Sequence, residues 1–230
     1  MNNHLRALII VTSVEKYPNF SRATGLWLGE AVHFYEKMVA EGIQVDIASP
    51  RGGYTPLDPE SLKEEAMSEI DWKFYGDESF RAKLGSTLKL STLKGSDYDV
   101  VYLAGGHGVV WDFKDNKELH RICAEAWQGS KIVASVCHGA VGLIDLKDSQ
   151  GNLIVKGRKV SSFTDEEEKL LGLHIFVPFL TETELTKQGA LFSKADPFKP
   201  FAVADGKLVT GQNPMSTQLV ADLVIKELKQ

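Results

Sequence analysis

The stretch Lys131–Ala140, KIVASVCHGA, decides the fold of this chain. Its first half is a short apolar run with β-branched residues, which predicts a buried strand. Its second half passes through Cys137 to Gly139 and further small residues, which allow a sharp turn into a helix. A strand, a tight turn and a helix in this order form a nucleophile elbow, which lifts one side chain off the end of a sheet. The lifted side chain here is Cys137.

The local sequence leaves two interpretations of Cys137 open. The helix after the turn would direct free backbone N–H groups at the sulfur and favour the thiolate. Alternatively, Cys137 is a small buried hydrophobe, as free cysteines usually are. The second cysteine, Cys123, falls on the apolar face of a predicted helix, and we interpret it as structural.

The composition is that of an ordinary globular protein. The chain has 230 residues, of which 43% are hydrophobic and 25% charged, and we interpret residues 1–230 as a single domain. The net charge of −5 argues against a nucleic acid or an anionic membrane surface as partner. No apolar run approaches the ~20 residues that span a bilayer. Because there are two cysteines and the N-terminal apolar segment is too short for a secretory signal, we expect a cytoplasmic protein.

Strands and helices alternate along the chain, which predicts a parallel α/β sheet covered by helices on both sides. The predicted elements are strands at Leu5–Thr12, Ile43–Ser49, Tyr98–Ala104 and Lys131–Val136, and helices at about Gly25–Glu41, Lys117–Trp127 and Thr181–Gln188, with a last helix after Asn213-Pro214. The dipeptide Asp205-Gly206 predicts a tight hairpin. Ligand sites in such folds lie at the carboxyl ends of the strands, and the loops after Ala104, Val136 and Ser162 all fall there.

The segment from residue 56 to residue 96 has a weaker pattern. Asp58 is a helix N-cap with Pro59 at the first helical position. Short helical pieces are expected around Leu62–Ile70 and Glu78–Leu84. We interpret this segment as a peripheral insertion that packs over one end of the sheet near the active site, and a plain peripheral subdomain is the alternative.

Glu30 is the next informative residue. It lies in the first predicted helix, with Leu26 and Phe34 four residues away on either side. A carboxylate inside an apolar stripe is costly, so its pKa is expected to rise. A protonated Glu30 near a thiolate would donate a hydrogen bond to it or shuttle protons. The alternative is a glutamate at the edge of the stripe that reaches solvent or pairs with a lysine.

His138 directly follows Cys137, and adjacent residues on an elbow do not usually point at each other. Its backbone N–H would help to form an oxyanion hole, and a carboxylate would fix the tautomer of its ring. Glu166, Glu167 and Glu168 are candidates for that carboxylate, and Asp165 would cap their helix. Three acids at a helix start also suit the helix dipole without any catalytic purpose.

The loop Gly105-Gly106-His107-Gly108 lacks the spacings of phosphate-binding loops. We interpret it as a tight loop whose N–H groups face the elbow. Metal binding through Glu30 and His33, or through Cys137 and His107, lacks a recurring ligand spacing, and we expect no metal site.

Five stretches in order along nearly the whole chain resemble the ThiJ/PfpI superfamily, which has the class I glutamine amidotransferase-like fold, and within it the glyoxalase III and stress-chaperone-like branch. They are Thr24–Glu30, Ala104–Gly108, Val136–Gly139, Ser162–Glu168 and Val209–Pro214. Ala104 stands where relatives often have proline, and Asp165 where many have asparagine. Residues 56–96 match least.

The resemblance implies a flavodoxin-like sheet and a set of catalytic roles. Cys137 would be the nucleophile, with Glu30 hydrogen-bonded to its sulfur. His138 would be the general base, oriented by Glu168, for which Glu167 is a rival. The backbone N–H groups of Gly106 and His138 would form the oxyanion hole, and His107 would contact substrate.

The resemblance implies a glyoxalase III-like lyase that converts a small 2-oxoaldehyde, methylglyoxal, to lactate with neither glutathione nor any other cofactor. It also suggests a homodimer. A cysteine-dependent hydrolase, deglycase or peptidase is the second hypothesis. A glutamine amidotransferase is disfavoured because no histidine follows His174. The third is a redox-responsive holdase chaperone or stress sensor, since an exposed thiolate of low pKa would be readily oxidised.

Overall fold

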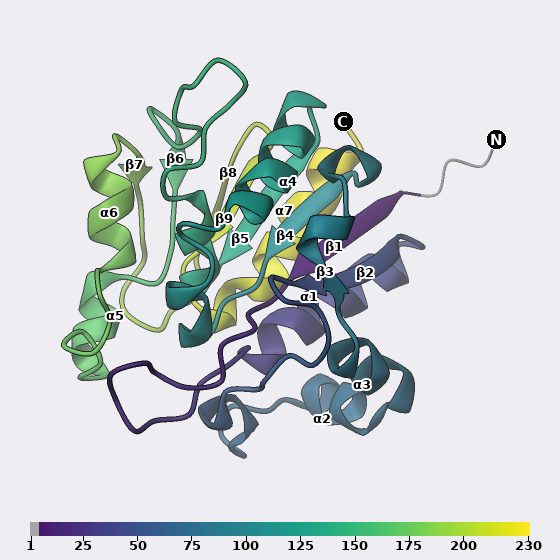
Figure 1. The fold of residues 1–230 in the computed structure, drawn as a ribbon, viewed down its shortest axis with the longest axis vertical. Helices are drawn as coiled ribbons and strands as arrows, with labels where there is room; N and C mark the ends of the chain where they lie inside the picture. Colours follow the sequence, from purple (N-terminus) through teal and green to yellow (C-terminus); the bar gives the residue numbers. More distant parts are fainter. Residues whose placement is uncertain (1–4) are drawn as a thin grey trace.

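A seven-stranded sheet runs through the middle of the structure, a computed structural model that describes residues 5–230 (Figure 1). The first four residues of the N-terminal segment, on which the expectation about a secretory signal partly rests, lie outside the described residues. The strand order is β3-β2-β1-β4-β5-β9-β8. The bounds are β1 Arg6–Ile10, β2 Gln44–Ser49, β3 Leu88–Lys89, β4 Val100–Leu103, β5 Ile132–Val136, β8 Ala202–Asp205 and β9 Leu208–Gly211, and a separate two-stranded sheet joins β6 Lys159–Val160 to β7 Leu191–Phe192.

The strands from β3 to β9 are parallel, and only the edge strand β8 runs antiparallel. The four predicted strands therefore form, each within two residues of its expected bounds at either end. The tight hairpin at Asp205-Gly206 is also confirmed, because β8 and β9 pair directly and Gly206 has a φ of +58°, which favours glycine. The mostly parallel flavodoxin-like sheet is thus as predicted, with one antiparallel edge.

Helices cover both faces of the sheet (Figure 1). Their bounds are α1 Leu28–Ala40, α2 Glu69–Gly76, α3 Glu78–Gly85, α4 Lys117–Gln128, α5 Asp165–Leu170, α6 Thr181–Lys187 and α7 Thr217–Leu228, and short 3-10 segments span Pro59–Leu62, Leu90–Thr92, Gly95–Asp97, His107–Trp111, Cys137–Leu143 and Pro214–Ser216. Helices α1 and α7 pack on one face and α4 on the other, so each face has its own apolar core. A parallel sheet with both faces buried explains the nearly continuous apolar runs of β1, β4 and β5.

In the segment from residue 56 to residue 96, α2 packs against α1 and α3 against β2, whereas the 3-10 turns at Leu90–Thr92 and Gly95–Asp97 pack against α4. Asp58 caps the short helix at Pro59–Leu62 as predicted, since its side chain accepts from the N–H of Glu60. The helical piece expected at Leu62–Ile70 is misplaced. Helix α2 begins only at Glu69, because Ser68 and Asp71 form a capping box there. Phe80 and Leu84 of α3 join the core.

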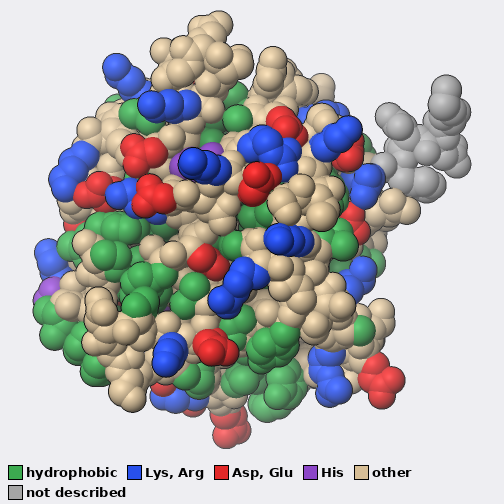
Figure 2. Space-filling model, in the orientation of Figure 1, with side chains coloured by type: hydrophobic (Ala, Val, Ile, Leu, Met, Phe, Trp, Pro, Cys, Tyr) green, Lys and Arg blue, Asp and Glu red, His purple; other side chains and the backbone are tan. Residues whose placement is uncertain are grey.

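Charged side chains of both signs are scattered over the face shown in Figure 2, and hydrophobic side chains gather at its lower left, where Figure 1 places α5. Leu170, Leu171 and Ile175 are among the exposed apolar residues. Within residues 5–230, no helix is both long enough and apolar enough to cross a membrane.

Candidate active site

Cys137 stands on a strained backbone turn at the carboxyl end of β5. Its φ is +55°, a left-handed conformation that a residue with a Cβ adopts only when the surrounding structure enforces it. The turn packs tightly against β4, because a Cβ on Gly139 would come within 2.1 Å of the carbonyl oxygen of Leu103. The strand and the small residues after it therefore form the predicted elbow. The segment that follows is a 3-10 helix rather than an α-helix.

The environment of the Cys137 thiol differs from the expectation of a low pKa. The residue is 3% exposed, and burial raises its pKa well above the ordinary value. A hydrogen bond from the backbone N–H of His138 acts in the opposite direction but does not outweigh burial. The resting sulfur is therefore a thiol, and it needs a base to become a nucleophile.

That base is at hand in the ring of His138. Its Nδ1 lies 3.4 Å from the Cys137 sulfur, and its Nε2 lies 2.6 Å from Glu168 Oε2. If Nε2–H donates to the carboxylate, Nδ1 carries the free lone pair that faces the thiol. Burial, then the nearby ring of His107, lowers the pKa of His138 and favours this neutral form. Although the two residues are adjacent in sequence, the elbow turns them toward each other.

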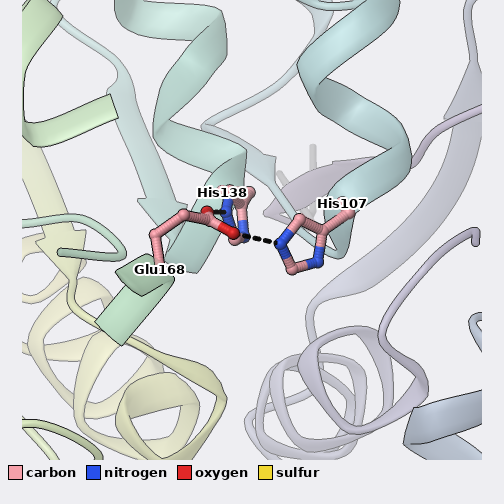
Figure 3. A group of neighbouring side chains, drawn as sticks. All are labelled: His107, His138 and Glu168. Atoms are coloured by element: carbon pink, nitrogen blue, oxygen red, sulfur yellow. Dashed lines mark hydrogen bonds and ion pairs between the residues drawn. The ribbon is translucent and has the colours of Figure 1, made fainter. Parts of the chain in front are cut away.

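Glu168 holds a second histidine as well. His107 Nε2 lies 2.8 Å from Glu168 Oε1, so the carboxylate bridges two rings whose centroids are 4.1 Å apart (Figure 3). Burial raises the pKa of Glu168, but the two histidines outweigh it and hold the pKa far below its ordinary value. Sequence reasoning placed His107 near the elbow but missed this pairing. Its signal was the position of His107 at the end of β4, beside the elbow strand.

The acidic residues that precede Glu168 in the sequence have structural roles. Glu167 accepts from the backbone and side chain of Thr164 and from the side-chain amides of Gln212 and Asn213. Thr164, and not Asp165, caps helix α5. Asp165 instead accepts from Thr183. Only Glu168, one residue further along α5, reaches the histidines.

Glu30 is fully buried on the first turn of α1 and accepts from the backbone N–H of Gly105 at 2.6 Å. Burial raises its pKa to about 8, against the effect of that bond. Its other oxygen, Oε1, makes no hydrogen bond of ordinary geometry. At neutral pH Glu30 is therefore a neutral acid beside the sulfur, and not an edge residue that reaches solvent.

The loop after β4 lies directly under the elbow. A Cβ on Gly105 would come within 2.9 Å of the backbone nitrogens of both His138 and Gly139, and one on Gly106 within 2.2 Å of the carbonyl oxygen of Gly25. Gly106 also has a φ of +95°. Glycine is thus required at both positions, and the loop's backbone approaches the elbow closely.

His107, His138 and Glu168 are also the group whose ligand atoms, all within 4.8 Å of one another, could hold a metal ion. Both Nε2 atoms are already within hydrogen-bonding distance of the carboxylate. A metal would have to displace both hydrogen bonds. His33, considered with Glu30 as a metal pair, contacts Ser68 and Asp71.

A cavity of about 380 Å³ opens onto the sulfur. Its apolar lining includes Trp27, Phe163, Leu171, Phe198 and Met215, and its polar lining consists of His33, Glu65, Asp71, His107, Cys137 and His138. Phe163 packs against the ring of His138, with centroids 4.5 Å apart. The contributions of Glu65 and Asp71 were missed by sequence reasoning, because nothing in residues 56–96 indicated which side chains face the elbow.

A model of the DJ-1/PfpI family matches residues 23–227 of the chain. The chain belongs to the DJ-1/PfpI family. This is the family predicted from the five sequence stretches, and the match covers all of them.

Curated and solved members of the family resemble the chain along almost its whole length. Glyoxalase 3 of Candida albicans is 30% identical over 230 aligned residues, which cover 96% of this chain and 97% of the relative. The crystal structure of glyoxalase III from the same organism superposes with a TM-score of 0.89 at 29% identity, covering 97% of both chains. Rapid Encystment Protein 24 kDa of Francisella tularensis superposes with a TM-score of 0.93 at 32% identity, covering 97% of this chain and 99% of that protein.

Proposed function

We propose that the protein is a glutathione-independent glyoxalase that converts a small 2-oxoaldehyde such as methylglyoxal to its 2-hydroxy acid, here lactate. The observation that carries the proposal is the line of contacts from the Cys137 sulfur to His138 at 3.4 Å and on to Glu168 at 2.6 Å, at the base of a largely apolar cavity. The names of relatives that match 96% of the chain support the same reaction class.

In the first step, His138 Nδ1 takes the proton of the Cys137 thiol while Nε2–H stays bound to Glu168. The sulfur forms a bond to the aldehyde carbon, and the carbonyl electrons move to the oxygen. In this proposal the backbone N–H groups of Gly106 and His138 stabilise that oxyanion. Return of the proton to the oxygen gives a hemithioacetal. Because the resting sulfur is a thiol, attack and proton transfer occur together.

In the second step, His138 removes the remaining hydrogen of the former aldehyde carbon as a proton. The electron pair moves toward the neighbouring ketone carbon, which gains this proton from His138, while the hydroxyl proton of the first carbon passes to the former ketone oxygen. The first carbon is thereby oxidised to a thioester, and the second is reduced to a secondary alcohol. Water then cleaves the thioester, releasing lactate and restoring the thiol. The net change is the addition of one water molecule, so atoms and electrons balance.

Glu30 serves in this scheme as the neutral donor beside the sulfur. Its pKa of about 8 keeps it protonated at neutral pH, and a protonated carboxyl can donate to a thiolate as it forms and to the thiolate expelled from the thioester. Glu168 keeps the proton of His138 on Nε2, which leaves Nδ1 free to act as the base. His107 lines the cavity and shares Glu168, which supports its proposed contact with substrate.

The direct test is to incubate purified protein with methylglyoxal without glutathione and to assay lactate. Cys137→Ala is expected to abolish product, and Cys123→Ala, which alters a fully buried sulfur on α4, is the matched control. Lactate formation that persists in Cys137→Ala would overturn the mechanism. Release of an amine from a model amide without any lactate would favour a cysteine hydrolase instead.

We also propose that residues 1–230 act as a single domain whose segment 56–96 shapes the pocket, and that the protein is a cytoplasmic homodimer. Glu65, Ala66 and Asp71 in that segment line the cavity, which supports the first part. Sequence resemblance supports the second part. Light scattering of the purified chain would test the dimer, and cell fractionation the compartment.

A further inference from the structure

The cavity has a second polar cluster that the proposed chemistry does not use. It consists of Asp71 and Ser68 at the start of α2 and His33 on α1. Asp71 and His33 both line the cavity that contains Cys137. The cluster therefore faces the same space as the nucleophile but comes from different elements.

One carboxylate oxygen of Asp71 accepts several hydrogen bonds, and the other accepts none. Oδ2 accepts from the backbone N–H of Ser68 at 2.8 Å and from its hydroxyl at 2.7 Å, which is the capping of α2. His33 Nε2 lies 3.2 Å from both carboxylate oxygens, but only its contact with Oδ2 has hydrogen-bond geometry. Oδ1 is thus buried without a hydrogen bond, in a residue that is 2% exposed.

An unpaired oxygen of a buried carboxylate is costly, because it has lost water without gaining a partner. Burial raises the pKa of Asp71, but the hydrogen bonds from His33 and Ser68 outweigh it and leave the pKa below its ordinary value. The carboxylate thus stays ionised and does not escape the cost by binding a proton. Capping of α2 requires Oδ2 alone, so it gives no reason for this arrangement of Oδ1.

Gly29 packs against Asp71 and puts no side chain next to Oδ1. A Cβ at this position would lie 3.3 Å from Oδ1, closer than to Oδ2 at 3.7 Å. Gly29 and Asp71 both line the cavity, so Oδ1 lies next to the space that a bound molecule would occupy. It lies within α1, where alanine would be more stable by about 1 kcal/mol, so helix formation does not call for glycine here.

We propose that Asp71 Oδ1, reached over Gly29, accepts a hydrogen bond from a hydroxyl group on the tail of the substrate, so that the enzyme takes hydroxylated, sugar-derived 2-oxoaldehydes longer than methylglyoxal. The inference rests on the proposed glyoxalase function and names a substrate class for it. The cavity of about 380 Å³ corresponds to roughly a dozen water molecules, whereas methylglyoxal has five heavy atoms. The space therefore accommodates a longer tail.

The charged residues that line the cavity indicate which substrate tails it can accept. The charged side chains that line the cavity are Glu65 and Asp71, and neither lysine nor arginine is among the lining residues that the structure describes between positions 5 and 230. Carboxylated or phosphorylated tails would meet two acids. His33 already lies beside the Asp71 carboxylate. A neutral hydroxyl group can therefore donate to Oδ1, whereas an ammonium group would compete with His33 for the carboxylate.

The test compares two six-carbon 2-oxoaldehydes, 3-deoxyglucosone with its hydroxylated tail and 2-oxohexanal with its apolar tail. The measured quantity is the ratio of their kcat/KM values. In Gly29→Ala, whose new Cβ crowds Oδ1, the ratio is expected to fall about tenfold in favour of the apolar aldehyde, as for the loss of one hydrogen bond to a charged acceptor. Comparing variants cancels the different hydration of the two aldehydes in water.

Gly76→Ala is the matched control, because this glycine also lies in a helix, α2, and its Cβ would meet nothing within 4 Å. It is expected to leave the ratio at the wild-type value. An unchanged ratio in Gly29→Ala, or an equal fall in Gly76→Ala, would overturn the proposal.

A second measurement separates this proposal from the proposed function. Formation of the hemithioacetal protects Cys137 from alkylation by iodoacetamide and does not require turnover. If neither aldehyde yields a hydroxy acid, the glyoxalase function fails. The subsite then stands if 3-deoxyglucosone still protects Cys137 at lower concentration than 2-oxohexanal, with the difference lost in Gly29→Ala. It fails if the ratio of the two protecting concentrations is the same in Gly29→Ala as in the wild type.

Discussion

Replacing Glu30 by glutamine should stabilise the protein while removing its activity. The carboxyl is fully buried, and its pKa of about 8 in the folded protein compares with 4.5 for an ordinary glutamate. Below about pH 4.5 the carboxyl is neutral in both the folded and the unfolded chain. As the pH rises toward 8, only the unfolded chain ionises, and the stability of the wild type is progressively lost.

The size of the stability change follows from the difference between the folded and unfolded pKa values of Glu30. At about 1.4 kcal/mol per pH unit, the wild type loses about 3 kcal/mol between pH 4.5 and about pH 7, and the loss levels off at about 5 kcal/mol above pH 8. Glutamine does not ionise, and its carbonyl can still accept from the N–H of Gly105. Glu30→Gln is therefore expected to be more stable by about 3 kcal/mol near pH 7, and nearly equal to the wild type near pH 4.

Urea unfolding followed by tryptophan fluorescence, at about pH 4, 7 and 9, measures this difference directly. The m-value of the unfolding transition should be the same in the wild type and in Glu30→Gln. The lactate assay should show at least a hundredfold loss of kcat, since an amide cannot transfer a proton. A stability difference that does not change with pH, or a variant less stable than the wild type at pH 7, would refute the assignment of a raised pKa to Glu30.

Three further predictions test other parts of the site. Glu168→Gln should lower kcat by about a hundredfold or more with little change in KM, because Glu168 orients His138 but does not line the cavity. Steady-state kinetics would measure this loss of kcat, and a rise in KM alone would contradict the prediction. Gly106→Ala should lower the melting temperature, because its Cβ would come within 2.2 Å of a carbonyl oxygen at a φ of +95°. Gly151→Ala, with a φ of +83° but nothing within 4 Å, controls for the backbone strain alone and should lower it less. Iodoacetamide near pH 8 should label one thiol per native chain, because Cys137 lines the cavity beside His138, which can take its proton, whereas Cys123 is fully buried on α4. Burial also raises the pKa of Cys123 to about 12, and mass spectrometry that finds Cys123 labelled before Cys137 would contradict the assignment.

The sheet could be predicted because its signals are local. The central strands β1, β4 and β5 are short, nearly continuous apolar runs, and burial on both faces requires such a run. The bounds of α2 were missed for a local reason too, since the capping box of Ser68 and Asp71 overrides the weak apolar pattern before it. Capping by Thr164 in place of Asp165 is a similar case.

The sequence could predict which residues belong to the site, but not how their side chains are arranged in space. The end of β5 placed Cys137, and the resemblance placed Glu30, His138 and Glu168, but no sequence rule gives the distance between side chains from separate loops. The pKa of Cys137 was expected to be low from the helix after the elbow. Complete burial of the sulfur, which depends on the whole fold, raises it instead. The pairing of His107 with Glu168 likewise appears only once the loops are folded together.

The bridging carboxylate of Glu168 links catalysis to the order in which the molecule assembles. Its two histidines follow neighbouring strands of the central sheet, whereas Glu168 itself lies on α5, a helix of six residues whose last residue, Leu170, remains exposed. Such a short helix holds its shape only while it is docked. Whenever α5 detaches, both rings lose the carboxylate at once, and the active site is dismantled although the sheet stays folded. Hydrogen exchange of the α5 amides would therefore measure the fraction of molecules that are ready to react.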